Sequence, residues 1–126
     1  MAQLLWICLG GALGTGARYL VGLGAAKLLG TGFPYGTLVV NLVGSFVISV
    51  VMYLSFDVPA ISTPMRLFLT TGILGGFTTY SSFNYETLRL ILNGYVGLGL
   101  ANAALTLVGG VVAGMLGLYA ASRLAG

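Results

Sequence analysis

The chemistry of this chain is concentrated in residues 70–83, which read T-T-G-I-L-G-G-F-T-T-Y-S-S-F. Two adjacent glycines, Gly75 and Gly76, precede an unbroken run of hydroxyl side chains, residues 78–82. Adjacent glycines weaken a helix by about 1 kcal/mol each relative to alanine, and Ser and Thr hydroxyls bond backbone groups released from a helix. The stretch therefore predicts a helix break. Inside a membrane, such breaks mark ion or substrate sites, because they free carbonyls and helix ends for coordination.

Two aromatic residues, Tyr80 and Phe83, flank Ser81 and Ser82 just after the expected break. Such a pair commonly packs in a core or faces lipid, but an aromatic ring is also electropositive at its edge and can meet an anion there. Hydroxyl and amide donors complete a set without carboxylates. This set suits a small, strongly hydrated anion and suits a metal cation poorly. The expected anion-path residues are Asn41, Tyr80, Ser81, Ser82, Phe83 and Thr106.

Asn41 belongs to a row of polar side chains at four-residue spacing, together with Thr37, Ser45 and Ser49. Residues four apart share one face of a helix. The row indicates either a polar track or a helix–helix interface. Asn41 is the informative member, because its NH2 group is a donor that can meet an anion.

The composition defines the setting of these residues. Only 6% of the residues in the chain are charged and 58% are hydrophobic, and the mean hydropathy is +1.05. We therefore expect an all-α integral membrane protein with one transmembrane domain over residues 1–126. At about 20 residues per span, the length allows four spans. A continuous third helix would be about 43 Å long against a hydrocarbon core of ~30 Å, which again favours a break. The expected spans are 4–29, 36–55, 64–92 with a break at 75–79, and 95–122.

Charges are few and evenly placed. With four spans, Arg66 and Arg123 lie on one side of the membrane and Lys27 and Arg89 on the other. This balance gives the positive-inside rule almost nothing to act on, so we expect insertion in both orientations and an antiparallel, dual-topology homodimer. Arg18 lies within the first span, where it either snorkels to the surface or faces an aqueous vestibule that attracts anions.

No enzymatic activity is expected. The second half of the third segment carries a single carboxylate, Glu86, which can pair with Arg89 three residues later. The chain has no histidine, and no nucleophile has a recognisable base. The five basic residues form no patch, so nucleic-acid binding is not indicated.

These motifs together resemble a known family. The run G-G-F-T-T-Y-S-S-F resembles the G-G-x-T-T-F-S-T-F signature of the Fluc (CrcB) fluoride channels. The similarity extends to G-T-L-x-x-N-L-x-G in the second span, G-x-x-x-R-Y in the first, and Glu86 after Phe83. It covers essentially the whole chain. Tyr80 stands at a position that is usually Phe in that family.

The resemblance implies a passive, highly fluoride-selective channel that exports cytoplasmic fluoride and gives fluoride resistance. It implies two antiparallel pores in a homodimer, within the bacterial cytoplasmic (inner) membrane. In that family two aromatic residues after the break form a box that lines the pores, and this role carries over to Tyr80 and Phe83. The resemblance also implies one structural Na+ per dimer, on the dimer axis, held by the backbone carbonyls of Gly75 and Thr78.

Two other classes are compatible with four short spans. A proton-coupled drug exporter of the small multidrug resistance type requires a carboxylate in the first span, where this chain has Arg18. A structural membrane subunit would show the close helix packing that small residues predict here, such as Gly10 and Gly14 at four-residue spacing in the first span. It would not need the polar positions Asn41, Ser81 and Thr106.

Overall fold

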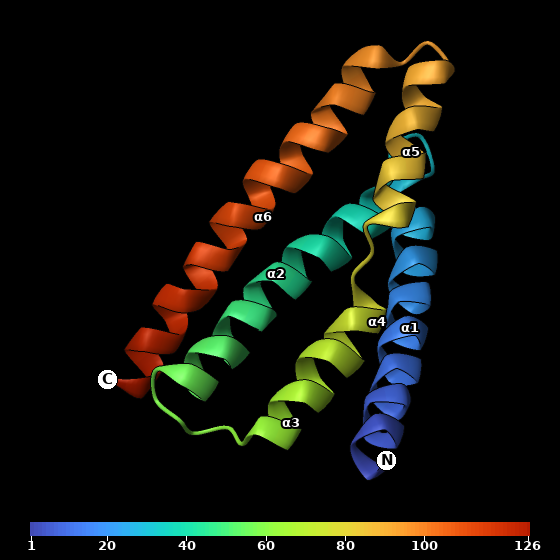
Figure 1. The fold of residues 1–126 in the computed structure, drawn as a ribbon. Coiled ribbons are helices and arrows are strands. Elements are labelled where there is room, and N and C mark those ends of the chain that lie inside the picture. The colour runs from blue at the N-terminus through green and yellow to red at the C-terminus, as the bar shows by residue number, and fades with distance from the viewer.

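The computed structural model describes all 126 residues, which form helices and short connections with no strand (Figure 1). The long helices are α1 (Ala2–Leu29), α2 (Tyr35–Phe56) and α6 (Val96–Ala125). Each of the three is long and apolar enough to cross a membrane. The chain is therefore an all-α membrane protein, as its composition predicts.

The segment between α2 and α6 is interrupted. It contains α3 (Thr63–Leu67), the π-helix η1 (Phe68–Leu74), α4 (Gly75–Phe77) and, after a gap, α5 (Ser81–Leu92). Ser62 caps its start, since the Ser62 Oγ accepts a hydrogen bond of 3.4 Å from the Met65 N–H. The backbone leaves the helix at Thr78, which is extended with φ −90° and ψ 162°.

The predicted break exists, but the predicted range of 75–79 was wrong at its start, since only residues 78 and 79 of it lie in the observed link. Residues 75–77 are still helical, and the non-helical link comprises residues 78–80. Glycine propensity placed the start of the break too early because Gly76 serves close packing instead. A Cβ on Gly76 would collide with the Gly11 carbonyl oxygen and would lie 2.9 Å from the Thr15 backbone nitrogen. Tertiary contact outweighs a propensity of about 1 kcal/mol per residue.

The helices form two pairs (Figure 1). In one pair, α1 runs beside η1 and α4; in the other, α2 runs beside α6. The link after α4 leads to α5, which packs on α6. Both termini and the α2–α3 loop lie at one end of the molecule, and the α5–α6 turn at the other. Gly94, with φ +91°, makes that turn, a backbone conformation that glycine adopts readily.

Small residues bring the paired helices together, as the sequence predicts. On α1, a Cβ on Gly14 would overlap the Ile73 carbonyl oxygen, and one on Gly10 would lie 3.0 Å from the Phe68 carbonyl oxygen. On α6, a Cβ on Gly117 would collide with the Phe46 carbonyl oxygen. These neighbours are backbone atoms, which cannot move without shifting a whole helix.

Gly14→Ala is therefore expected to lower stability by about 1–3 kcal/mol through overpacking, seen as a lower unfolding temperature in detergent. Gly16→Ala is the matched control, because a Cβ on Gly16 meets nothing within 4 Å. Equal unfolding temperatures for the two variants would contradict the close approach of α1 to η1.

Candidate functional site

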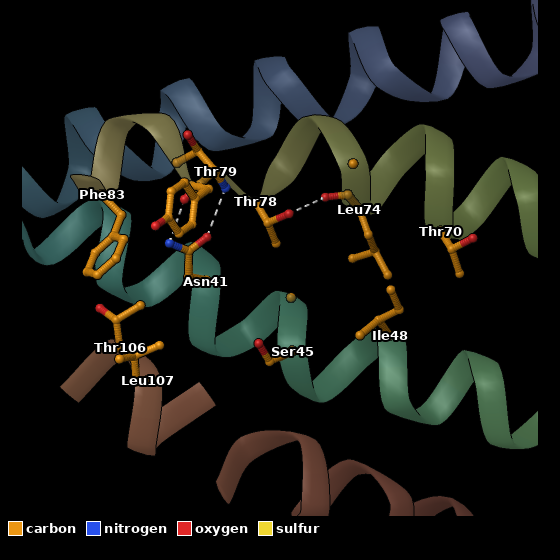
Figure 2. A pocket seen from close by; sticks show the side chains of 13 residues that line it. Asn41, Ser45, Ile48, Thr70, Leu74, Thr78, Thr79, Phe83, Thr106 and Leu107 are labelled. Carbon is orange, nitrogen blue, oxygen red and sulfur yellow. Dashed lines mark hydrogen bonds between the residues drawn. The ribbon is translucent and has the colours of Figure 1, made fainter. Parts of the chain in front are cut away.

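A cavity of about 500 Å³ lies between α2, the broken segment and α6 (Figure 2). We call this cavity the groove, because it is open on the side of Tyr80, a lining residue that is 76% exposed. It has thirteen lining residues: Asn41, Gly44, Ser45, Ile48, Thr70, Leu74, Gly75, Thr78, Thr79, Tyr80, Phe83, Thr106 and Leu107. None of them is charged, and the polar ones offer only hydroxyl, amide and backbone groups.

The groove brings together some of the predicted site residues and not others. Asn41, Tyr80, Phe83 and Thr106 line it, as do Gly75 and Thr78. The expected hydroxyls of Ser81 and Ser82 do not line it within this chain.

The side-chain amide of Asn41 is paired with the backbone of the break (Figure 2). Its Nδ2 donates to the Thr79 carbonyl at 2.9 Å, and its Oδ1 accepts from the Thr79 N–H at 2.9 Å. An Asn amide carries a donor and an acceptor like those of a peptide group, so this side chain replaces a missing backbone partner. The predicted donor therefore serves the break first. Only one N–H of its NH2 group remains for a ligand.

The same hydrogen bonds deprive two carbonyls of their helical donors. In a continuous helix, the Thr79 N–H would donate to the Gly75 carbonyl, but here it donates to Asn41. The Ser82 N–H, which would donate to the Thr78 carbonyl, instead donates to the Thr79 Oγ1 at 3.2 Å. The carbonyls of Gly75 and Thr78 are thus left as acceptors beside the groove.

The two aromatic rings meet edge to face. The ring centroids of Tyr80 and Phe83 are 5.9 Å apart with 67° between the ring planes. Phe83 is 8% exposed, and its side chain and that of Thr106 both point into the groove (Figure 2). The Thr106 hydroxyl is buried and has no hydrogen-bond partner in the chain, which leaves it free to donate to a ligand.

The two charged residues singled out from the sequence lie beside the groove, not in it. Arg18 Nε donates to the Gly76 carbonyl at 2.9 Å, and Arg18 lines a separate cavity of about 370 Å³. The Glu86 carboxylate accepts a 2.6 Å hydrogen bond from the Thr37 hydroxyl. Glu86 and Thr37 line a third cavity of about 190 Å³.

The polar row of α2 serves both of the functions that its spacing left open. Thr37 bonds Glu86 on α5, Asn41 bonds Thr79 in the link before α5, and Ser45 lines the groove. The Ser49 Oγ lies 3.2 Å from where a Cβ on Gly114 would stand, so Ser49 packs against α6.

Sequence reasoning missed one buried polar contact near the groove. The Asn102 Nδ2 donates to the Thr87 Oγ1 at 2.9 Å, which joins α6 to α5. Asn102 was visible as a polar residue one turn before Thr106, but nothing in the sequence named Thr87 as its partner.

The fold and the groove define an integral membrane protein in which the broken segment, α2 and α6 surround a groove without charged side chains. Residues 5–118 match the family model described as CrcB-like protein, Camphor Resistance (CrcB). The chain belongs to the CrcB family.

Curated relatives share close to half of their residues with this chain. It is 51% identical over 113 residues to the fluoride-specific ion channel FluC of Anaeromyxobacter sp. (strain K), with 90% of each chain covered. It is 48% identical over 124 residues to the protein of that name from Sorangium cellulosum (strain So ce56), with 98% of each covered. A Clostridium perfringens (strain 13 / Type A) relative of the same name is 50% identical over 103 residues, covering 82% of this chain and 80% of its own.

Asn41→Leu is expected to accelerate amide hydrogen exchange at Thr79, because it removes both hydrogen bonds that hold this peptide group. Leaving the two groups unpaired costs about 1–3 kcal/mol each, so the unfolding temperature should fall as well. The control is Asn84→Leu on the first turn of α5, where Asn84 is exposed. Unchanged exchange at Thr79 in Asn41→Leu would contradict the pairing.

Proposed function

We propose that this chain forms a passive, fluoride-specific ion channel that exports cytoplasmic fluoride. The observation that carries the proposal is the groove, which joins hydroxyl and amide donors to aromatic ring edges without a charged side chain. The relatives of this chain are named fluoride-specific ion channels. A full positive charge would hold an anion too tightly for conduction, since a conducting site must also let its ion leave.

The groove supplies the groups needed to replace water around a small anion. The free Thr106 hydroxyl and the remaining N–H of Asn41 donate hydrogen bonds. The edges of Tyr80 and Phe83 present partial positive charge. Each of these contacts is weak, so the ion can pass from one to the next.

The biological role follows from acid–base chemistry. Hydrogen fluoride is neutral, crosses bilayers and ionises in a near-neutral cytoplasm, which traps fluoride inside the cell. A membrane potential that is negative inside drives the anion out through a passive pore. Fluoride resistance, in the bacterial cytoplasmic (inner) membrane, is the proposed outcome.

We further propose that the channel is an antiparallel homodimer. A single chain leaves Tyr80 76% exposed at the groove, where polar groups would face lipid. A second copy laid over this face would complete the wall, and could also bring the hydroxyls of Ser81 and Ser82 to the path. The balance of two basic residues per side favours opposite orientations.

A structural sodium ion on the dimer axis fits the residues present. Sodium is a hard cation that carbonyl oxygens coordinate, as they do in channel filters and in broken transporter helices. The carbonyls of Gly75 and Thr78 lack their helical donors and so have free lone pairs. The same pair from a second copy would give four oxygen ligands. Bound sodium would tie the two breaks together and would carry no step of fluoride transfer.

Purified protein in liposomes tests the proposed function. After valinomycin, KF-loaded vesicles should release fluoride rapidly, while KCl-loaded vesicles retain chloride. Phe83→Ile should slow fluoride release about fivefold, which is the factor for loss of an aromatic contact worth ~1 kcal/mol. The proposed dimer should stay associated in this variant. The matched control is Phe68→Ile, because Phe68 packs on Trp6 away from the groove. If neither the intact wild-type protein nor the Tyr80→Phe variant released fluoride, the proposed function would be overturned.

Orientation is tested in membranes of the expressing cells, and sodium dependence on the purified protein. In sealed right-side-out vesicles from those cells, a membrane-impermeant maleimide should label about half of the Ala2→Cys, Cys8→Ser chains, because Ala2 is exposed and balanced charges give both orientations. Replacing Na+ by N-methylglucamine should lower the unfolding temperature of the dimer. Labelling of all or none of the chains would contradict dual topology, and an unchanged unfolding temperature would contradict the ion site.

A further inference from the structure

We propose that Asn102 and Thr87 are positioning residues that hold Phe83 against the groove. The structural basis is a hydrogen-bond chain across two helices. The Asn102 Nδ2 donates to the Thr87 Oγ1 at 2.9 Å, and the Thr87 Oγ1 donates to the Phe83 carbonyl at 2.8 Å. Phe83 is thereby linked through its backbone to α6, the helix that carries Thr106 on the opposite wall of the groove.

The direction of this chain follows from the available hydrogens. A Thr hydroxyl has one hydrogen, and that of Thr87 is used on the Phe83 carbonyl. Thr87 must therefore accept from Asn102, which requires the NH2 group of the amide on that side. The Asn102 Oδ1 then points elsewhere, buried and without a partner.

The burial of the Asn102 side chain indicates that its hydrogen bond to Thr87 matters for the arrangement of the helices. Asn102 is 1% exposed, and an amide is an expensive group to bury with its oxygen unsatisfied, at about 1–3 kcal/mol. An apolar residue would pack here without that cost. What the amide supplies is an interhelical hydrogen bond, the interaction by which polar side chains fix one membrane helix against another.

The helices approach closely enough at this place for the bond to set a register. A Cβ on Gly99 would lie 3.1 Å from the Thr87 carbonyl oxygen and 2.6 Å from the Ile91 Cγ1. With α5 and α6 in contact, the hydrogen bond determines the rotation of α5 about its axis. That rotation decides whether the Phe83 ring, one turn before Thr87, faces Thr106 or turns away.

Fluoride flux and ring order together test the proposal, whose flux arm rests on the proposed function. Thr87→Val keeps the shape of the side chain and removes the hydroxyl, and Asn102→Leu removes the donor. Each is expected to slow fluoride efflux about fivefold, the factor for one hydrogen bond worth ~1 kcal/mol. The double variant should be no slower than either single one, because both substitutions break the same chain. Thr87→Ser keeps the hydroxyl group, so this variant should release fluoride at the wild-type rate.

Ser55→Ala is the matched control. The Ser55 Oγ donates to the Val51 carbonyl four residues back, as Thr87 does to Phe83, but it has no partner on another helix. Its loss should leave efflux unchanged. The proposal would be overturned if the Asn102→Leu, Thr87→Val double variant slowed efflux additively. It would also be overturned if Thr87→Ser slowed efflux as much as Thr87→Val.

A second measurement does not depend on conduction. With 4-fluorophenylalanine at position 83, wild-type protein should give one sharp fluorine resonance, and Thr87→Val a shifted or split one. A wild-type protein that conducts no fluoride would end the proposed function, while the fluorine spectra would still decide the positioning. Identical spectra for wild type and Thr87→Val would show that Thr87 does not hold the ring.

Discussion

The pairing of the Asn41 side chain with the Thr79 peptide group is the interaction on which the rest of the structure depends. A helix break exposes N–H and C=O groups, and in hydrocarbon each unsatisfied group costs several kcal/mol. Asn41 satisfies two of them at once. The Thr79 hydroxyl receives the Ser82 N–H, and Arg18 donates to the Gly76 carbonyl. Three side chains thus pair four of the backbone groups that the interruption releases.

Those side chains reach the break only because the helices approach one another closely. Gly14 and Gly76 let the backbones of α1 and α4 nearly touch, which places Arg18, one turn after Gly14, at the Gly76 carbonyl. Gly44, one turn below Asn41, leaves room for the Thr78 methyl group. Packing and polar satisfaction are therefore one constraint, and the glycines are its precondition.

Much of this could be predicted from the sequence, because composition and periodicity report directly on burial in lipid. The helical class, the long spans, the small-residue packing and the existence of a break are of this kind. The position of the break was not, since glycine propensity cannot show that Gly76 faces the backbone of α1. Asn41 was recognised as important, but its partner Thr79 depends on how α2 lies against the link. The Asn102–Thr87 bond likewise joins two helices whose relative rotation no local pattern encodes.

One break can serve two ions of opposite charge because it creates two helix ends of opposite polarity. The stretch from α3 to α4 ends in carbonyls, those of Gly75 and Thr78 having lost their helical donors, and a helix C-terminus carries partial negative charge. Helix α5 begins directly after it at Ser81, and a helix N-terminus carries partial positive charge. The proposed sodium ion belongs at the first end. The proposed fluoride path, with Tyr80 and Phe83, belongs at the second. The two sites can lie a few residues apart in one chain because the Asn41–Thr79 pairing holds the two ends apart.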